Sequence, residues 1–215
     1  MPKINMVNVR QMPAELGRVR YTEGLFPKKT HDEILDVLDE SAAEFKPESG
    51  VRCGKEWVTE ERRTAFFTDG KKDYSYAGKI RPGERFKSRK CPKLAKVVRM
   101  CVRVAKREFG VNANTAIVTR YLGKAPGQKA GELGYHADNE KGLKKSAPIV
   151  GFTFARGARR EFRVRANTWK VGQPTYVLRP ASGSAYAMVD MQDKTKHSIA
   201  TGTDERFSVT LREIE

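Results

Sequence analysis

The second half of the chain consists of short segments that favour β-strands, separated by glycine-rich or polar turns, with no helical pattern between them. We expect strands at residues 115–122, 132–137, 149–154, 160–166, 175–179, 184–190, 196–199 and 206–213. Eight short strands without intervening helices suit a jelly roll. The sequence therefore predicts a cupin-like double-stranded β-helix over residues 111–215.

Two helices are expected before this region, which makes the fold class mostly β with added α (α+β). Thr30 is a suitable N-cap for the first helix, and Pro47 and Gly50 would end it. The second helix is expected at residues 92–109 and would stop at Gly110. Both carry an apolar stripe on one face, which predicts that they pack against the jelly roll.

The segment between the helices, residues 51–90, has the pattern of short strands with many aromatic side chains. Phe66 and Phe67 are expected to lie partly in the core. Tyr74 and Tyr76 share one strand face and are better placed to contact a substrate. At 215 residues the chain suits one compact domain, with an arm or edge strand at 1–18, helices and a recognition lid at 19–110, and the β-helix after them.

The chain is strongly basic, with 42 Lys and Arg against 26 Asp and Glu and a net charge of +16. An excess of this size favours a polyanionic partner, DNA or RNA, although solubility alone is the alternative explanation. No apolar run is long enough for a membrane helix, and the first residues lack the core of a signal peptide. We therefore expect a soluble intracellular protein of the nucleus or cytoplasm, acting as a monomer without a membrane partner.

Three residues form a candidate metal-binding set: His136, Asp138 and His197. In a strand, residues two apart point to the same face, so His136 and Asp138 can share one ion. A second histidine from a distant strand completes the two-histidine, one-carboxylate set that leaves open positions on non-haem Fe(II). An isolated H-x-D is weak evidence, because a polar turn after Gly131 and Gly134 gives the same pattern.

Arg206 and Arg212 stand at the two ends of an alternating segment. Phe207 and its alternate neighbours would face the core, while Arg206, Ser208 and Arg212 would share the opposite face. Arginine binds carboxylates through two parallel hydrogen bonds, so the two side chains suit a short dicarboxylate. A basic, solvated strand face is the alternative.

Together these residues resemble the AlkB family of Fe(II)- and 2-oxoglutarate-dependent dioxygenases, whose signature is H-x-D, a distal His and R-x-x-x-x-x-R. Tyr121, with Thr119 in place of the usual Asn, resembles the family's Asn-x-Tyr, which helps to hold 2-oxoglutarate. Of the two arginines, the resemblance places Arg206 on the distal carboxylate and Arg212 near the metal-bound one.

Further segments extend the resemblance over most of the chain, from about residue 20 to Arg212. Arg63 and the following aromatics, with Tyr74-Ser-Tyr76-Ala-Gly78, resemble the family's nucleotide-recognition lid. Residues 149–165 resemble its S-x-G-x-x-R-x-F-x-x-R strand pair, with Ala155 at the Ser position and Arg160 within the pair.

The resemblance implies an enzyme in which His136, Asp138 and His197 are both metal ligands and catalytic residues. The cofactors would be Fe(II), 2-oxoglutarate and O2, and the reaction N-demethylation of bases such as 1-methyladenine or 3-methylcytosine, giving succinate, CO2 and formaldehyde. Such a reaction serves DNA repair or RNA demethylation.

The same resemblance implies the residues that meet the substrate. Glu140 would contact the base, whereas an exposed turn acid is its alternative role. The expected substrate contacts are Phe66, Tyr74, Tyr76, Glu140 and Arg160. Three other functions remain open: a member of the family directed at RNA, one directed at protein, and a nucleic-acid-binding module that has lost catalysis.

Overall fold

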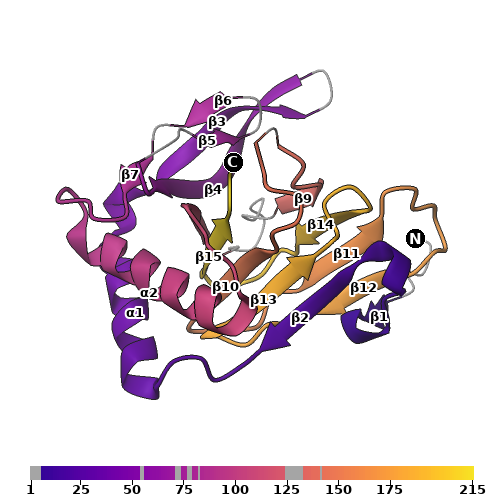
Figure 1. Ribbon diagram of the computed structural model, residues 1–215, viewed down its shortest axis with the longest axis horizontal. Helices are drawn as coiled ribbons and strands as arrows, with labels where there is room; N and C mark the ends of the chain where they lie inside the picture. Colours follow the sequence, from indigo (N-terminus) through magenta and orange to yellow (C-terminus); the bar gives the residue numbers. More distant parts are fainter. Residues whose placement is uncertain are drawn as a thin grey trace.

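The structure is a computed structural model that describes residues 6–53, 56–70, 74–76, 79–81, 83–123, 133–140 and 142–215. Figure 1 shows its elements. In chain order they are β1 (Met6–Asn8), η1 (Val9–Gln11), η2 (Ala14–Leu16), β2 (Arg18–Thr22), α1 (Lys28–Glu40), η3 (Ala42–Glu44), β3 (Lys46–Cys53), β4 (Glu56–Thr68), β5 (Tyr74–Tyr76), β6 (Lys79–Arg81), β7 (Glu84–Arg85), α2 (Pro92–Phe109), β8 (Thr115–Tyr121), β9 (Leu133–His136), β10 (Ile149–Ala155), β11 (Phe162–Ala166), β12 (Thr175–Leu178), β13 (Ser184–Val189), β14 (Thr195–Ile199) and β15 (Arg206–Arg212).

The eight strands predicted for the second half are confirmed as β8 to β15, and they divide evenly between two sheets. The minor sheet has the order β1-β12-β11-β14-β9, and the major sheet has the order β2-β13-β10-β15-β8-β4-β3 with β7 beside β4. Strands β8 to β15 pair with one another antiparallel throughout. The double-stranded β-helix is therefore present, and the first-half strands lengthen both of its sheets.

Alternation along β15 separates the two faces of the major sheet. Phe207, Val209 and Leu211 are buried in the cluster that also contains the helices. Ser208 and Arg212 belong to the opposite face, which lines a cavity between the sheets. Register with β8 and β10 fixes this arrangement, since Val209 lies opposite Val118 on one side and Phe152 on the other. One face is thus apolar and covered, while the other supplies polar groups.

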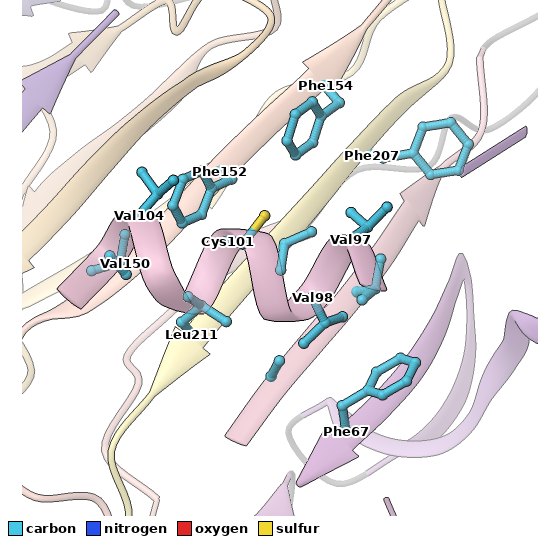
Figure 2. Packing of buried hydrophobic residues seen from close by; sticks show 14 of the residues in the cluster. Phe67, Val97, Val98, Cys101, Val104, Val150, Phe152, Phe154, Phe207 and Leu211 are labelled. Carbon is cyan, nitrogen blue, oxygen red and sulfur yellow. The ribbon is translucent and has the colours of Figure 1, made fainter. Parts of the chain in front are cut away.

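Helix α2 covers the apolar face, as predicted from its stripe. Figure 2 shows Val97, Val98 and Cys101 of the helix packed over the phenylalanines of β10 and β15. The helix spans the predicted residues, and Gly110 ends it at a φ of 73°, the left-handed conformation that glycine adopts without strain. Cys91 and Cys101 are buried free thiols.

Helix α1 differs from the prediction at both ends. It begins at Lys28, so the prediction of Thr30 as N-cap is wrong: the amide of His31 already donates to the carbonyl of Pro27 at 2.9 Å. It ends at Glu40 rather than at Pro47, which lies inside β3 and pairs with Arg63 of β4.

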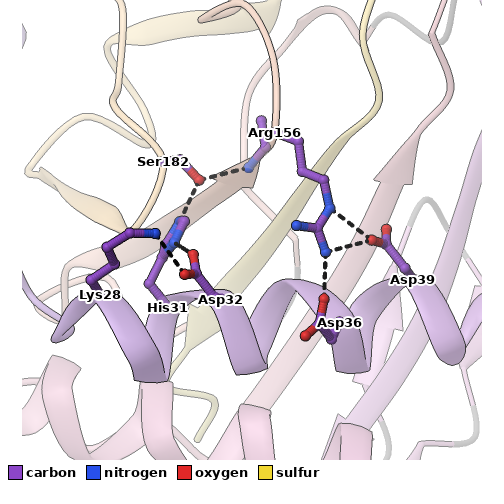
Figure 3. Close-up of polar contacts among 8 residues, drawn as sticks. Lys28, His31, Asp32, Asp36, Asp39, Arg156 and Ser182 are labelled. Atoms are coloured by element: carbon purple, nitrogen blue, oxygen red, sulfur yellow. Dashed lines mark hydrogen bonds and ion pairs between the residues drawn. The ribbon is translucent and has the colours of Figure 1, made fainter.

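Polar contacts tie α1 to the jelly roll (Figure 3). The imidazole of His31 lies between the carboxylate of Asp32 and the hydroxyl of Ser182, at 3.1 and 2.7 Å. Arg156 donates to Asp36 at 2.6 Å and to Asp39 at 3.1 Å. These contacts position the helix across the end of β10.

The lid region is more regular than the predicted short strands. β4 is a single strand of 13 residues that pairs with β8 on one side and β3 on the other. Its continuity follows from its β-favouring sequence, which carries aromatic and threonine residues without a glycine or proline to interrupt it. Among the described residues, no helix is both long and apolar enough to cross a membrane.

Candidate active site

The strand pairing brings the predicted metal ligands together. His136 ends β9 and lies opposite His197 of β14 in the antiparallel register, with their ring centroids 4.2 Å apart. Asp138 follows two residues later, and each histidine Nε2 lies 3.6 Å from one of its carboxylate oxygens. One ligand atom from each of the three residues lies within 4.8 Å of the others. The spacing and the N,N,O donor set fit a divalent iron ion.

The protonation states also suit a metal ion. Burial alone would raise the pKa of the Asp138 carboxyl, but Arg212 and the two histidines outweigh burial and hold it well below its usual range. Arg212 donates to Asp138 Oδ1 at 2.8 Å. Burial, helped by His136, lowers the pKa of His197 to about 3. The site therefore presents a carboxylate and at least one neutral imidazole, the forms that ligate metals.

The orientation of His136 is set by the backbone. Its Nδ1 lies 2.9 Å from the carbonyl oxygen of Gly134, which can only accept a hydrogen bond. Nδ1 must therefore carry the proton, and the lone pair of Nε2 points toward Asp138. Such a contact fixes the tautomer of a metal-binding histidine.

Arg206 lies at the end of β15 opposite Arg212, and it is 1% exposed. Its Nη2 donates to Thr153 Oγ1 at 2.9 Å, and its guanidinium carbon lies 5.1 Å from the centroid of the Tyr121 ring. Its Nε and Nη1 have no hydrogen-bond partner in the part of the chain that the structure describes. A buried cation with unused donors fits the carboxylate of a bound acid, because a bare buried charge is costly.

A cavity between the sheets is lined by the predicted metal ligands and by the predicted co-substrate residues other than Arg206. Thr119, Tyr121, Ser208 and Arg212 line it together with the three metal ligands. The remaining lining residues are Arg62, Ile117, Leu133, Gly151, Tyr186, Met188, Ile199 and Thr210. Gly151 makes room for Tyr186, since a Cβ at this position would lie 2.7 Å from the tyrosine Cζ.

Sequence analysis missed Arg62. It is 4% exposed and lines the cavity, whereas Arg63, the residue matched to the lid motif, is exposed on the other face of β4. The motif spacing R-x-x-x-F fits Arg62 with Phe66 as well as Arg63 with Phe67. Phe67 belongs to the core under the helices, so the alternation assigns Arg62 to the cavity side.

The expected substrate residues have different positions. Arg160 is 4% exposed, and its Nη2 donates to four backbone carbonyl oxygens: that of Asp204, and those of Leu122 at 2.8 Å, Gly202 at 3.4 Å and Tyr121 at 3.5 Å. This placement favours a structural role, clamping the ends of β8 and β15, over the predicted substrate contact. Phe66 packs against Ile117 and Ile214 beside the cavity.

Glu140 is nearer to the metal ligands. Burial raises the pKa of its carboxyl, against the opposing influence of Arg212, and its Oε2 has no hydrogen-bond partner among the described residues. Tyr74 and Tyr76 form β5, as the strand prediction required, but their side chains lie outside the described part of the structure.

Comparisons of sequence find no matching protein-family model and no matching curated protein. Comparison of structures gives a clear result. An oxidoreductase of the 2OG-Fe(II) oxygenase family from Burkholderia pseudomallei matches 98% of this chain over 94% of its own, with a TM-score of 0.58 and 14% identity. The fold is that of the 2OG-Fe(II) oxygenases.

Two further structures share this fold. A prolyl hydroxylase from Trichoplax adhaerens, in complex with a fragment of the oxygen degradation domain of hypoxia inducible factor, matches 96% of this chain and 86% of its own, with a TM-score of 0.56 and 12% identity. OsALKBH1 matches 91% of this chain and 97% of its own, with a TM-score of 0.55 and 14% identity. At these identities the likeness establishes the fold, while the chemistry depends on the residues of the site.

Proposed function

We propose that the chain is an Fe(II)- and 2-oxoglutarate-dependent dioxygenase that removes N-linked methyl groups from bases in nucleic acid. One observation carries the proposal: His136, Asp138 and His197 converge on one point at one end of the cavity, and at the far end of the same face Arg206 keeps two buried donors unused. An ion and a dicarboxylate would use both features, whereas a binding module needs neither.

The residues have distinct roles in this proposal. His136, Asp138 and His197 would hold the iron, which together with 2-oxoglutarate and O2 supplies the oxidation when bound. Arg212 keeps Asp138 ionised and oriented through its hydrogen bond. Because it lies beside Asp138, it is also the arginine that we propose for the metal-side carboxylate of 2-oxoglutarate.

Arg206 would bind the distal carboxylate of 2-oxoglutarate. Its planar guanidinium can donate two parallel hydrogen bonds to a carboxylate. Tyr121, Thr119 and Ser208 line the cavity with the metal ligands, and the guanidinium of Arg206 lies behind this lining, 5.1 Å from the Tyr121 ring. Their hydroxyl groups can donate to the co-substrate, so Thr119 supplies a donor where the AlkB pattern has an amide.

Nucleic acid is the substrate class that the charge supports. A net charge of +16 on 215 residues favours a polyanion over a protein, which speaks against the protein substrate that the fold shared with a prolyl hydroxylase would also allow. The target base must leave its stack to reach the iron. Glu140, with its unpartnered buried oxygen, is the proposed acceptor for the exocyclic amine of that base.

The test is mass spectrometry of oligonucleotides that carry 1-methyladenine or 3-methylcytosine, prepared as DNA and as RNA, after incubation with Fe(II) and 2-oxoglutarate. We expect loss of the methyl group with matching yields of succinate and formaldehyde. The matched control is His197→Ala, which should show neither product. Turnover of a proline-containing peptide but of no methylated oligonucleotide would refute the nucleic-acid assignment and leave the dioxygenase assignment intact.

A further inference from the structure

Basic residues are concentrated in one segment that the proposed site does not use. Between residues 85 and 107 the chain contains no Asp or Glu. We call its basic residues the α2 tract: Arg85, Lys87, Arg89, Lys90, Lys93, Lys96, Arg99, Arg103, Lys106 and Arg107. Other segments also lack an acid, such as 109–131 and 162–189, but they carry three and four basic residues, whereas this segment carries ten.

The fold places the tract on the outside of the molecule, behind the cavity. The apolar side chains of α2 pack on the covered face of the major sheet, whose other face lines the cavity (Figures 1 and 2). Lys87, Lys96, Arg103 and Lys106 are exposed. Positions 96, 99, 103 and 106 recur every three or four residues, so they form one row with a spacing of about 5 Å along the helix.

Most of these charges have no ion pair with a residue that the structure describes. Three of the ten are paired: Lys90 with Glu84 at 3.4 Å, Lys93 with Glu40 at 2.7 Å, and Arg107 with the adjacent Glu108 at 2.6 Å. Lys87, Arg103 and Lys106, in contrast, have no ion pair or side-chain hydrogen bond to any residue that the structure describes. Their ammonium and guanidinium groups are free to meet phosphates.

The neighbouring helix bounds this surface on one side. The outward residues of α1 include Glu33, Asp36, Asp39 and Glu40, and Arg156, directly after β10, binds two of them (Figure 3). The two helices therefore present opposite charges to solvent. Because Arg156 and Lys93 pair with three of these four acids, their repulsion of an anionic strand is weak, and the unpaired cations of α2 determine where the strand binds.

We infer that the α2 tract binds the phosphate backbone of a nucleic acid outside the cavity, and this inference rests on the proposed substrate class. The tract leads toward the site: β7, where it begins, pairs with Phe67 and Thr68 of β4, about 17 Å along that strand from the cavity residue Arg62. From there α2 continues for about 27 Å. The tract would hold a strand whose target base enters the cavity.

The test is fluorescence anisotropy with an unmethylated single-stranded oligonucleotide of about 20 nucleotides, without iron or 2-oxoglutarate. The test variant is Lys87→Glu/Arg103→Glu. The control is Arg10→Glu/Lys170→Glu, which changes two exposed charges by the same amount on η1 and in the loop after β11, beside the minor sheet rather than beside α2. A glutamate at position 103 lies one turn from Arg99 and Arg107, so the helix itself is not weakened.

We expect the dissociation constant of the test variant to rise about tenfold at low salt, and its log-log salt slope to fall by about 0.7 for each phosphate that the protein no longer neutralises. The control should change both quantities little. Equal effects of the two variants would show that the total charge alone matters and would overturn the inference. Sedimentation of the wild type and of both variants tests whether the tract instead binds a second copy of the chain. A wild-type dimer that dissociates in the test variant would show this and would overturn the inference.

These outcomes separate the inference from the proposed function. Binding is measured without turnover, so a catalytically inactive chain can still confirm that the α2 tract binds nucleic acid. Conversely, a test variant with normal binding and normal demethylation would disprove nucleic-acid binding by the α2 tract and leave the enzyme assignment in place.

Discussion

Arg206→Met should make the ligand-free protein more stable while it removes the response to 2-oxoglutarate. In the ligand-free protein two buried donors of Arg206 lack partners among the described residues, at a cost of about 1–3 kcal/mol each. Methionine relieves about 4 kcal/mol of this cost. It forfeits the charged hydrogen bond to Thr153, about 2 kcal/mol, and the stacking on the Tyr121 ring, about 1 kcal/mol.

The net effect is about 1 kcal/mol in favour of the variant, which corresponds to a rise in melting temperature of about 3 °C for a chain of this length. Wild-type protein with Mn(II) and 2-oxoglutarate at about 100 times the Kd gains about 2.7 kcal/mol, or about 8 °C. The assay is differential scanning fluorimetry of both proteins with and without the acid.

Two results would refute this reasoning. A variant that melts well below the wild type without ligand would show that Arg206 is satisfied in the folded protein. A variant that keeps the full 2-oxoglutarate shift would show that the acid binds elsewhere. Arg206→Lys is the matched control: it keeps the buried charge with a different donor geometry, so it should lose the ligand response without the gain in stability.

Three further predictions concern the candidate metal ligands, Gly151 in the cavity wall, and Arg160. His136→Ala or Asp138→Ala should abolish succinate formation while oligonucleotide affinity stays largely intact; turnover in both variants would disprove the metal site. Gly151→Ala should lower the free energy of unfolding by about 1–3 kcal/mol, because its Cβ would meet the Tyr186 ring at 2.7 Å, and urea denaturation measures this change. Arg160→Ala should cost about 3 kcal/mol in the same assay, since it strands buried carbonyl oxygens; a variant of normal stability with weakened substrate binding would restore the substrate role.

The strands of the jelly roll were predictable because their alternation and turn residues are local signals. The same holds for α2, whose apolar stripe and Gly110 mark its extent. The end of α1 was not predictable in this way. Helix breakers set only an outer limit, and the pairing of Lys46 and Pro47 with β4 draws this segment into the sheet earlier.

At the candidate site, the convergence of His136, Asp138 and His197 and the shared face of the two β15 arginines could be predicted from sequence, because their spacing reflects strand geometry. Arg62 and Arg63 could not be separated, since both are arginine and both precede an aromatic residue at the same interval. Only the side of β4 that meets the core decides between them. For Arg160 the sequence has a different limit. The motif identifies its position, but its hydrogen-bond acceptors lie in loops distant in sequence, which the motif does not identify.

The two-sided character of β15 also bears on how the chain finds its fold. Its partners β8 and β10 fix which residues face the helices and which face the cavity. If β15 paired one residue out of step, Arg206 and Arg212 would enter the apolar layer beneath α2 and three large hydrophobic side chains would leave it. The cost of burying two bare guanidinium groups in that layer excludes the misaligned pairing. The two arginines proposed to bind the co-substrate would therefore also disfavour misaligned pairing of β15 during folding.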